Sequence, residues 1–179
     1  LGGLKTGLGA ADSQKAWLAG FSYADGVWLY GTGDGGQTWS SVKLPIDPTY
    51  STEAGSAPSW PPAFVDGQNG FLPVTFGGNG FVVFYPTRNG GNTWELTVPV
   101  SVMDRQPVWS FVDSKHGFVA AGNKLHVTTD SAQSWQAMDL KLNDISQLRF
   151  ISAEQGWAVA EGKLFKTADG GHTWIQLTK

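Results

Sequence analysis

The chain has 179 residues, a formal net charge of −3, 24 glycines and no cysteine. The lack of cysteine excludes disulfides and thiolate metal sites, and the small net charge without basic runs disfavours nucleic acids and anionic membranes as partners. No stretch approaches the roughly 20 apolar residues that a membrane helix needs. A composition of 13% aromatic and only 15% charged residues, with many glycines, predicts short strands joined by tight turns and almost no helix.

Four successive segments of the chain each contain short runs of apolar, β-branched and aromatic residues, separated by Gly or Asp clusters. Each segment is therefore predicted to be a four-stranded antiparallel meander. The strands are predicted near 8–11 and at 16–21, 26–30 and 38–44 in the first repeat, at 63–65, 70–75, 80–85 and 93–98 in the second, at 108–112, 117–121, 124–128 and 134–138 in the third, and at 145–152, 156–160, 163–167 and 173–177 in the fourth.

One segment, 45–62, interrupts this rhythm. It carries five prolines, Pro45, Pro48, Pro58, Pro61 and Pro62. Too many backbone donors are missing for a central strand, so the segment is predicted to be a long loop between the first and second repeats. A loop of this length on a rigid scaffold is a natural place for a binding site.

A single meander cannot bury its own faces in water, so the four units are predicted to stack radially as the blades of a β-propeller. The prediction is one propeller domain over 1–179, with blades at about 1–45, 60–99, 106–140 and 144–179. The chain starts at Leu1 without an initiator Met, which favours a mature form or a fragment. We expect an open arc or part of a larger propeller, whose open blade edges would allow self-association.

The third and fourth strands of every repeat are joined by a turn of the form Thr-x-(Asp/Asn)-x-x-x-(Thr/Ser)-Trp. In it, the Asp or Asn oxygen is expected to accept backbone N–H bonds from two or three residues further on, Gly to supply a positive φ, and Trp to start the outer strand. Ala132 replaces Gly in the third copy, which predicts a conformational cost or a different turn. The structural residues are Asp34, Gly36, Trp39, Asn89, Gly91, Trp94, Asp130, Trp135, Asp169, Gly171 and Trp174.

A calcium-binding or catalytic role is the alternative for these carboxylates, because acidic residues in Gly-rich loops also bind metals. The structural role is preferred, since the repeat places the same residue type in every blade. A second set, Asp12, Asp66 and Asp113, is predicted to form the turns between the first and second strands.

The turns Thr32–Trp39, Thr87–Trp94 and Thr167–Trp174 resemble the Asp-box, also called the BNR repeat. The wider pattern, with 156–160 and 162–167 followed by the box, is similar to propellers of the photosystem II assembly and stability factor type, and this resemblance spans essentially the whole chain. The Asp-box group also includes sialidases, xyloglucan-degrading hydrolases and sortilin-type receptors. The resemblance therefore implies the fold far more than the function.

Alternating strand direction sorts the connections onto two faces. The Asp-box turns and the first-to-second turns share one face, and the second-to-third turns and blade linkers share the other, which is free to vary. The candidate binding residues of this second face are Tyr23, Asp25, Tyr50, Trp60, Asp104, Arg105 and Glu161. Trp60 could grip a partner or pin its loop to the blade below, and Asp104 with Arg105 could bind an anion or be solvated.

Known catalytic sets are not recognisable. A sialidase needs three convergent arginines, but Arg88, the first of only three in the chain, lies inside a box turn on the wrong face. Glycoside hydrolysis needs a pair of carboxyls, and nothing in the sequence pairs those left on the candidate face. The three histidines do not form a set with metal-ligand spacing, so no metal or cofactor site is predicted.

The sequence thus predicts a non-catalytic binding or assembly module, bacterial and secreted or cell-envelope in location, with a protein or carbohydrate partner. Recognition is expected through the loops opposite the Asp-box face. The alternative is an Asp-box glycoside hydrolase, or a fragment of one, that uses paired carboxylates.

Overall fold

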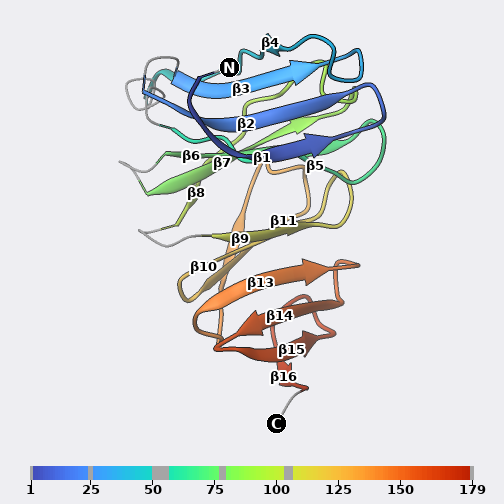
Figure 1. Ribbon diagram of the computed structural model, residues 1–179. Coiled ribbons are helices and arrows are strands. Elements are labelled where there is room, and N and C mark those ends of the chain that lie inside the picture. The colour runs from blue at the N-terminus through green and yellow to red at the C-terminus, as the bar shows by residue number, and fades with distance from the viewer. Residues whose placement is uncertain (1, 24–25, 50–56, 77–79, 103–106, 178–179) are drawn as a thin grey trace. The chain divides into compact units, whose positions relative to one another are not determined.

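The computed structural model describes residues 2–23, 26–49, 57–76, 80–102 and 107–177 (Figure 1). These residues contain no α-helix; their sixteen strands form four four-stranded antiparallel sheets, which confirms the predicted all-β, propeller-like array of four blades. Within every sheet the strands follow one another in chain order, as a meander requires.

The first sheet contains β1 (Leu4–Ala10), β2 (Ala16–Ser22), β3 (Gly26–Thr32) and β4 (Ser40–Ser41), and the second contains β5 (Ala63–Phe64), β6 (Gly70–Phe76), β7 (Phe81–Thr87) and β8 (Val100–Ser101). The third contains β9 (Val108–Phe111), β10 (Gly117–Ala121), β11 (Lys124–Thr128) and β12 (Gln136–Asp139), and the fourth contains β13 (Ile145–Phe150), β14 (Gly156–Ala160), β15 (Lys163–Thr167) and β16 (Ile175–Gln176).

The fourth strands are shorter than predicted, and β8 lies beyond the predicted range 93–98. In that range the chain still follows β7, but through irregular bonds. Glu95 N–H donates to Pro86 O at 2.9 Å, and the hydroxyl of Thr97 rather than a backbone group donates to Phe84 O at 2.7 Å. A regular ladder is therefore not formed until after Pro99, which has no N–H to donate.

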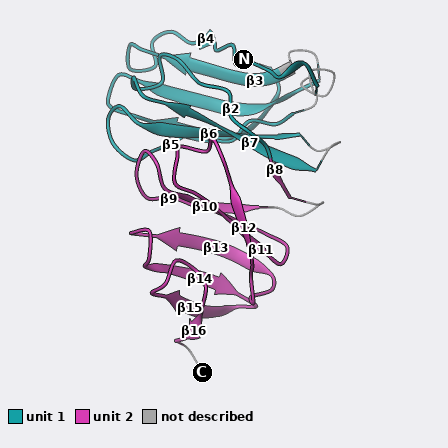
Figure 2. Cartoon of the chain, turned by 180° about the vertical axis from the view of Figure 1, so that it is seen from behind, with its two compact units in different colours: residues 1–99 teal, residues 100–179 magenta. Residues whose placement is uncertain are grey.

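The chain divides into two compact units, residues 1–99 and 100–179 (Figure 2). In the first unit, apolar side chains of the first two sheets form one core. Trp17 is at its centre: its ring stacks on Phe64 at 5.1 Å and meets Trp94 edge-on at 5.9 Å. Aromatic contacts of this kind add to the free energy gained by burying apolar area.

In the second unit the third and fourth sheets share a core of their own, built around Phe118 and Phe150, whose rings stack at 3.6 Å. Leu125 and Leu148 are among the other buried residues of this core. Alternation along β13 buries Leu148 and Phe150 against the third sheet and leaves Gln147 and Arg149 exposed on the opposite side.

The four turns of the Thr-x-(Asp/Asn)-x-x-x-(Thr/Ser)-Trp type, called box turns below, share one hydrogen-bond pattern. A buried Thr hydroxyl at the strand end accepts the N–H four residues further on, at 2.9–3.0 Å, and donates to the Asp or Asn oxygen at 2.7–3.0 Å. That oxygen in turn accepts the N–H four residues beyond it at 2.9 Å. The acceptor thus reaches four residues, not the two or three expected from simple Asx turns.

Ala132 keeps the same turn instead of adopting another one. Ser131 and Ala132 have φ values of 65° and 66°, where the other box turns have two glycines. The N–H of Ala132 still reaches Thr128 Oγ1 at 3.0 Å. The third blade therefore pays the conformational cost of two non-glycine residues in the left-handed region.

The first-to-second turns lie beside the box turns. Asp12, Asp66 and Asp113 each accept backbone N–H bonds from residues two and three positions on, at 2.7–2.8 Å, as the turn argument predicts. In every blade one box-turn N–H also donates to a carbonyl of the neighbouring turn, at 2.8–3.1 Å. One face of each blade is therefore occupied by internal hydrogen bonds.

Candidate functional site

The candidate binding residues fall into three groups. Asp25, Tyr50, Asp104 and Arg105 lie outside the described residues. Tyr23 and Trp60 belong to the first unit, and Glu161 belongs to the second.

Tyr23 is 86% exposed at the end of β2, and its ring meets Phe21 edge-on at 4.6 Å. An exposed aromatic ring held by a neighbour is able to contact a partner at little entropic cost.

Trp60 is held in the fold by hydrogen bonds from two donors, its backbone N–H and its indole N–H. Its backbone N–H donates to Pro73 O at 2.8 Å, and its indole Nε1 donates to Thr75 Oγ1 at 3.2 Å. Both acceptors belong to β6. Of the two roles considered for this residue, the geometry matches the pin that holds the Pro-rich segment onto the blade.

The end of the Pro-rich segment is likewise a packed connection. Ser59 is fully buried and bridges to Val74 of β6, and its N–H donates to Gly20 O of β2 at 2.9 Å. The segment predicted as a long loop over 45–62 is, over residues 57–62, packed as a strap between the first two sheets.

Glu161 lies in a tight hairpin turn between β14 and β15. It has a φ of 50°, and its N–H donates to Asp144 O at 3.4 Å, while Asp144 itself has a φ of 47°. Asn143 Nδ2 donates to Glu161 Oε1 at 3.3 Å. Non-glycine residues in this backbone region concentrate at functional sites, because the strain is kept only where the surroundings enforce it.

A pocket of about 420 Å³ lies on this same side of the second unit, opposite the box turns. We call it the loop-face pocket. Its lining residues are Ser101, Val102, Ala121, Gly122, Asn123, Lys124, His126, Ala137, Asn143 and Asp144. They come from the end of β8, the β10–β11 hairpin, β12 and the β12–β13 linker, so the pocket brings together groups that are far apart in the sequence.

Charge in this pocket is arranged around Lys124. Its Nζ makes an ion pair with Asp139 Oδ1 at 2.6 Å, which lowers the pKa of that carboxyl. Burial lowers the pKa of His126, and the charge of Lys124 adds to the effect. His126 is therefore a neutral donor and acceptor near pH 7 rather than a cation. Sequence reasoning did not select Ser101 or His126, since neither stands in a motif.

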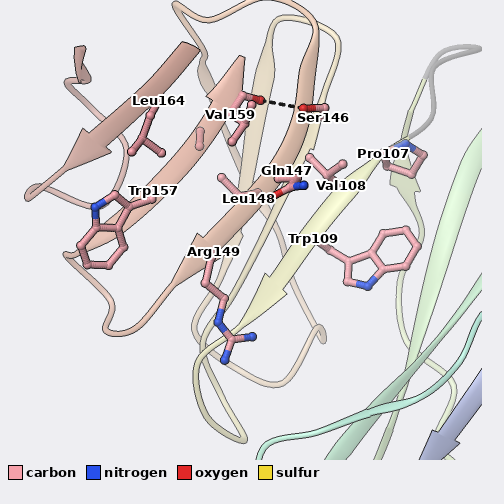
Figure 3. Close-up of a pocket in the computed structure, with 11 residues that line it drawn as sticks. Pro107, Val108, Trp109, Ser146, Gln147, Leu148, Arg149, Trp157, Val159 and Leu164 are labelled. Carbon is pink, nitrogen blue, oxygen red and sulfur yellow. Dashed lines mark hydrogen bonds between the residues drawn. The ribbon is translucent and has the colours of Figure 1, made fainter. Parts of the chain in front are cut away.

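A second hollow, which we call the Trp–Arg groove, has a volume of about 510 Å³ and opens along β9, β13 and β14 (Figure 3). Its most distinctive side chains are Trp109, Arg149 and Trp157, and Gln147 lines it as well (Figure 3). Arg149 is the last of the chain's three arginines, Arg88, Arg105 and Arg149, which the sequence offered only for a sialidase site, and neither tryptophan was selected from the sequence. The signal was present as alternation, because Gln147 and Arg149 occupy the exposed side of β13.

The box-turn carboxylates are engaged by their own turns. Hydrogen bonds from the Thr38 side chain and backbone, and from Thr32, lower the pKa of Asp34 to about 2. Bonds from the Thr173 side chain and backbone lower the pKa of Asp169 to about 2 in the same way. Each is an ionised acceptor already saturated by donors, which is the chemistry of a structural turn.

Within the described ranges no group of three or more His, Asp or Glu side chains is placed to hold a metal ion. No helix among these residues has the length and apolar character needed to cross a membrane.

No protein-family model matches the chain. A curated relative, the photosystem II assembly lipoprotein Ycf48 of Synechococcus sp. (strain CC9902), is 34% identical over 74 residues. That match covers 38% of this chain and 22% of the relative, which is about a fifth of the relative's length.

Among solved structures, YCF48 bound to D1 peptide is similar with a TM-score of 0.56 and 14% identity, over 98% of this chain and 82% of that one. An ancestral GH74 enzyme is similar with a TM-score of 0.62 and 15% identity, over 99% of this chain and 24% of that one. The Penicillium chrysogenum alpha-L-arabinanase complexed with arabinobiose is similar with a TM-score of 0.53 and 16% identity, over 100% of this chain and 64% of that one. The chain is thus a β-propeller that resembles the photosystem II assembly factor.

Proposed function

We propose that this chain is a non-catalytic binding module that holds a segment of a protein partner at the loop-face pocket. The observation that carries the proposal is the convergence of amide and ammonium groups in that pocket. Asn123, Asn143 and Lys124 come from two separate connections and line one hollow. Amide side chains match the alternating N–H and C=O groups of a peptide backbone, since each offers both a donor and an acceptor.

The backbone around the pocket supports a binding role. The positive φ values of Asp144 and Glu161 and the bonds between these two turns keep the connections in one conformation. A rigid rim lowers the entropy lost on binding. The similar solved structure in complex with a D1 peptide and the assembly role in the name of the curated relative point to a polypeptide as the bound class.

The second candidate is a glycoside hydrolase, because several propellers of similar fold are glycoside-cleaving enzymes. Asp144 and Glu161 are acidic residues of the loop face whose backbones are joined by a hydrogen bond of 3.4 Å. A general acid in such a pair needs apolar surroundings that raise its pKa, but the Glu161 side chain is exposed. This geometry favours binding over catalysis.

The test is an array of 15-residue peptides of varied sequence. It is probed with the unmodified chain and with the double variant Asn123→Ala/Asn143→Ala. We expect the unmodified chain to bind a subset of peptides and the double variant to bind them about tenfold more weakly, because two polar contacts are removed. Gln155→Ala, an exposed amide on the box-turn side of the same unit, is the matched control and should leave binding unchanged.

Two results would overturn the proposal. One is equal binding by the double variant and the control. The other is cleavage of a polysaccharide panel by the unmodified chain that is lost in Asp144→Asn and in Glu161→Gln, which would establish the hydrolase instead.

A further inference from the structure

Within the second unit, the fourth sheet has one side that no other described sheet of that unit covers. Leu148, Phe150 and Ala158 point into the core shared with the third sheet. Their neighbours in each strand point the other way, because successive side chains of a strand alternate between faces. This second side of the sheet continues the Trp–Arg groove.

Strand pairing places the exposed side chains of this side in two cross-strand rows. Arg149 of β13 pairs with Trp157 of β14, which pairs with Lys166 of β15. In the next row Gln147 pairs with Val159, which pairs with Leu164. Directly paired side chains lie about 5 Å apart at Cβ, so each row is a continuous strip across the sheet.

The first row is cationic and aromatic. Lys166 Nζ lies 5.5 Å from the ring centre of Trp157, within the range of a cation–π contact. The Arg149 guanidinium has no hydrogen-bond or ion-pair partner in the part of the chain that the structure describes, and its side chain extends from β13 into the groove (Figure 3). None of the described residues that line the groove is acidic. Two positive charges thus lie on one face of a chain whose net charge is −3.

The second row is apolar apart from Gln147, and Pro107 and Val108 extend the apolar floor of the groove. A sugar hydroxyl donates as well as accepts hydrogen bonds, whereas the described side chains that line the groove include no carboxylate and only one amide, Gln147, to accept them. Ser146 already donates its hydroxyl to Val159 O at 3.3 Å. A carboxylate next to an aliphatic side chain matches the two rows better, because the carboxylate meets the cations and the aliphatic group meets Val159 and Leu164.

We propose that this face of β13–β15 is a docking surface for an extended, acidic segment of a partner polypeptide. The acidic side chain of that segment contacts Arg149 and Lys166, and an aliphatic residue two positions along contacts the Val159–Leu164 row. Residues two apart in an extended peptide lie on the same side, with a spacing that matches adjacent rows of the sheet. This surface is on strands and is separate from the loop-face pocket, so it goes beyond the proposed function.

The probe is a synthetic, end-blocked peptide with the repeat Ser-Glu-Ser-Leu, titrated into the full chain by isothermal calorimetry. Its counterpart has Gln in place of every Glu. We expect the Glu peptide to bind and the Gln peptide to bind about fivefold more weakly, since an exposed ion pair contributes up to about a fivefold change in affinity. Raising the ionic strength to about 1 M, where the Debye length is about 3 Å, should remove the difference.

Variants locate the binding on the sheet. Arg149→Gln and Lys166→Gln should each weaken binding of the Glu peptide by about fivefold. Lys163→Gln is the matched control, because Lys163 is an exposed cation at the start of the same strand, β15. Lys163 pairs with Ala160, which faces the core, so Lys163 lies on the other side of the sheet from Arg149 and Lys166. Circular dichroism should show unchanged folding for all three, as none of these side chains is fully buried.

Three results would overturn the docking surface. Equal binding of the Glu and Gln peptides would remove the charge argument, and an effect of Lys163→Gln as large as that of Arg149→Gln would place binding elsewhere. A dimer in analytical ultracentrifugation that dissociates in Arg149→Gln would show that a second copy covers the face. Because Asn123→Ala/Asn143→Ala leaves this face unaltered, failure here is distinguishable from failure of the proposed function.

Discussion

The hydroxyl of Ser59 shows how a single polar atom can satisfy buried backbone groups of other strands. It accepts the N–H of Gly20 at 3.0 Å and donates to Trp28 O at 2.7 Å, and the residue is fully buried. The hydroxyl therefore satisfies backbone groups of β2 and β3 from a segment almost 40 positions away. Such groups would otherwise be buried without partners.

We predict that Ser59→Ala lowers the free energy of unfolding by about 1–3 kcal/mol, because it leaves a buried donor and acceptor unsatisfied. Ser41→Ala, in the exposed strand β4, is the control and should change it by less than about 0.5 kcal/mol. Urea denaturation followed by tryptophan fluorescence measures both. Equal values for the two variants would show that the Ser59 bonds do not matter for stability.

Sequence reasoning assigned no role to Ser59 and left two roles open for Trp60, to grip a partner or to pin its loop. Both residues stand among prolines, and a Pro-rich run is correctly predicted to be irregular. Which strands lie on either side of the run depends on the packing of the first two sheets. The indole N–H of Trp60 donates to Thr75 of β6, which matches the pinning role.

At the level of the element, the box turns do more than reverse the chain. In the second and fourth blades they also contact the preceding blade. A Cβ on Gly91 would lie 2.1 Å from the Trp17 ring, and one on Gly171 would lie 2.3 Å from Leu125 Cδ2. The same position of the first blade, Gly36, has only Trp39 of its own turn nearby, at 3.8 Å. Two of the glycines therefore serve both the turn and the packing between blades.

This difference predicts unequal effects of one substitution. Gly36→Ala should cost about 1 kcal/mol for a left-handed alanine, a conformation that Ala132 already adopts in the third blade. Gly91→Ala should cost a further ~1–3 kcal/mol, because the added methyl overlaps the Trp17 ring in a packed core. Chemical denaturation of both variants gives the comparison, and equal losses would mean that the Trp17 ring accommodates the added methyl without cost.

For the molecule as a whole, the turn carboxylates link folding to pH. Hydrogen bonds lower the pKa of the described acids Asp12, Asp34, Asp47, Asp66, Asp130 and Asp169, and of Asp113 against the opposing effect of its burial. Since the folded-state pKa lies below the unfolded value, each contributes stability above that unfolded value, and the contribution is lost as the pH falls through the folded pKa.

We therefore expect the free energy of unfolding to be nearly constant from pH 7 to about 5 and to fall between about pH 4 and pH 2. This window is set by the ordinary aspartate pKa of 3.8 and the pKa of about 2 for Asp34 and Asp169. Asp169→Asn should reduce the loss over this window. The second blade shows that an amide fits, because Asn89 accepts the Thr93 N–H at 2.9 Å and donates to its hydroxyl.

Denaturation curves at pH 7, 4 and 2.5 test this expectation for both proteins. An Asp169→Asn variant with the same pH profile as the unmodified chain would exclude Asp169 as a source of the acid sensitivity. Gln155→Ala, which alters an exposed side chain of the same face, is the control for the substitution itself.

What the sequence determined by itself is the local architecture of each blade. Strand order, the meander topology and the position of the box turns all follow from hydrogen bonds that span at most a few residues, such as Thr167 to Gly171 and Asp169 to Thr173. Interactions of such short range are encoded in contiguous residues, so a repeated motif reveals them.

The tertiary structure alone decided which side chains meet. The loop-face pocket joins Ser101, Asn123 and Asn143, and the Trp–Arg groove joins Trp109 to Arg149 and Trp157. No motif marks these sets, because they depend on how neighbouring strands register and how one sheet packs on the next. Packing is a sum of weak, non-directional contacts between distant segments, and it is settled only when the whole core forms.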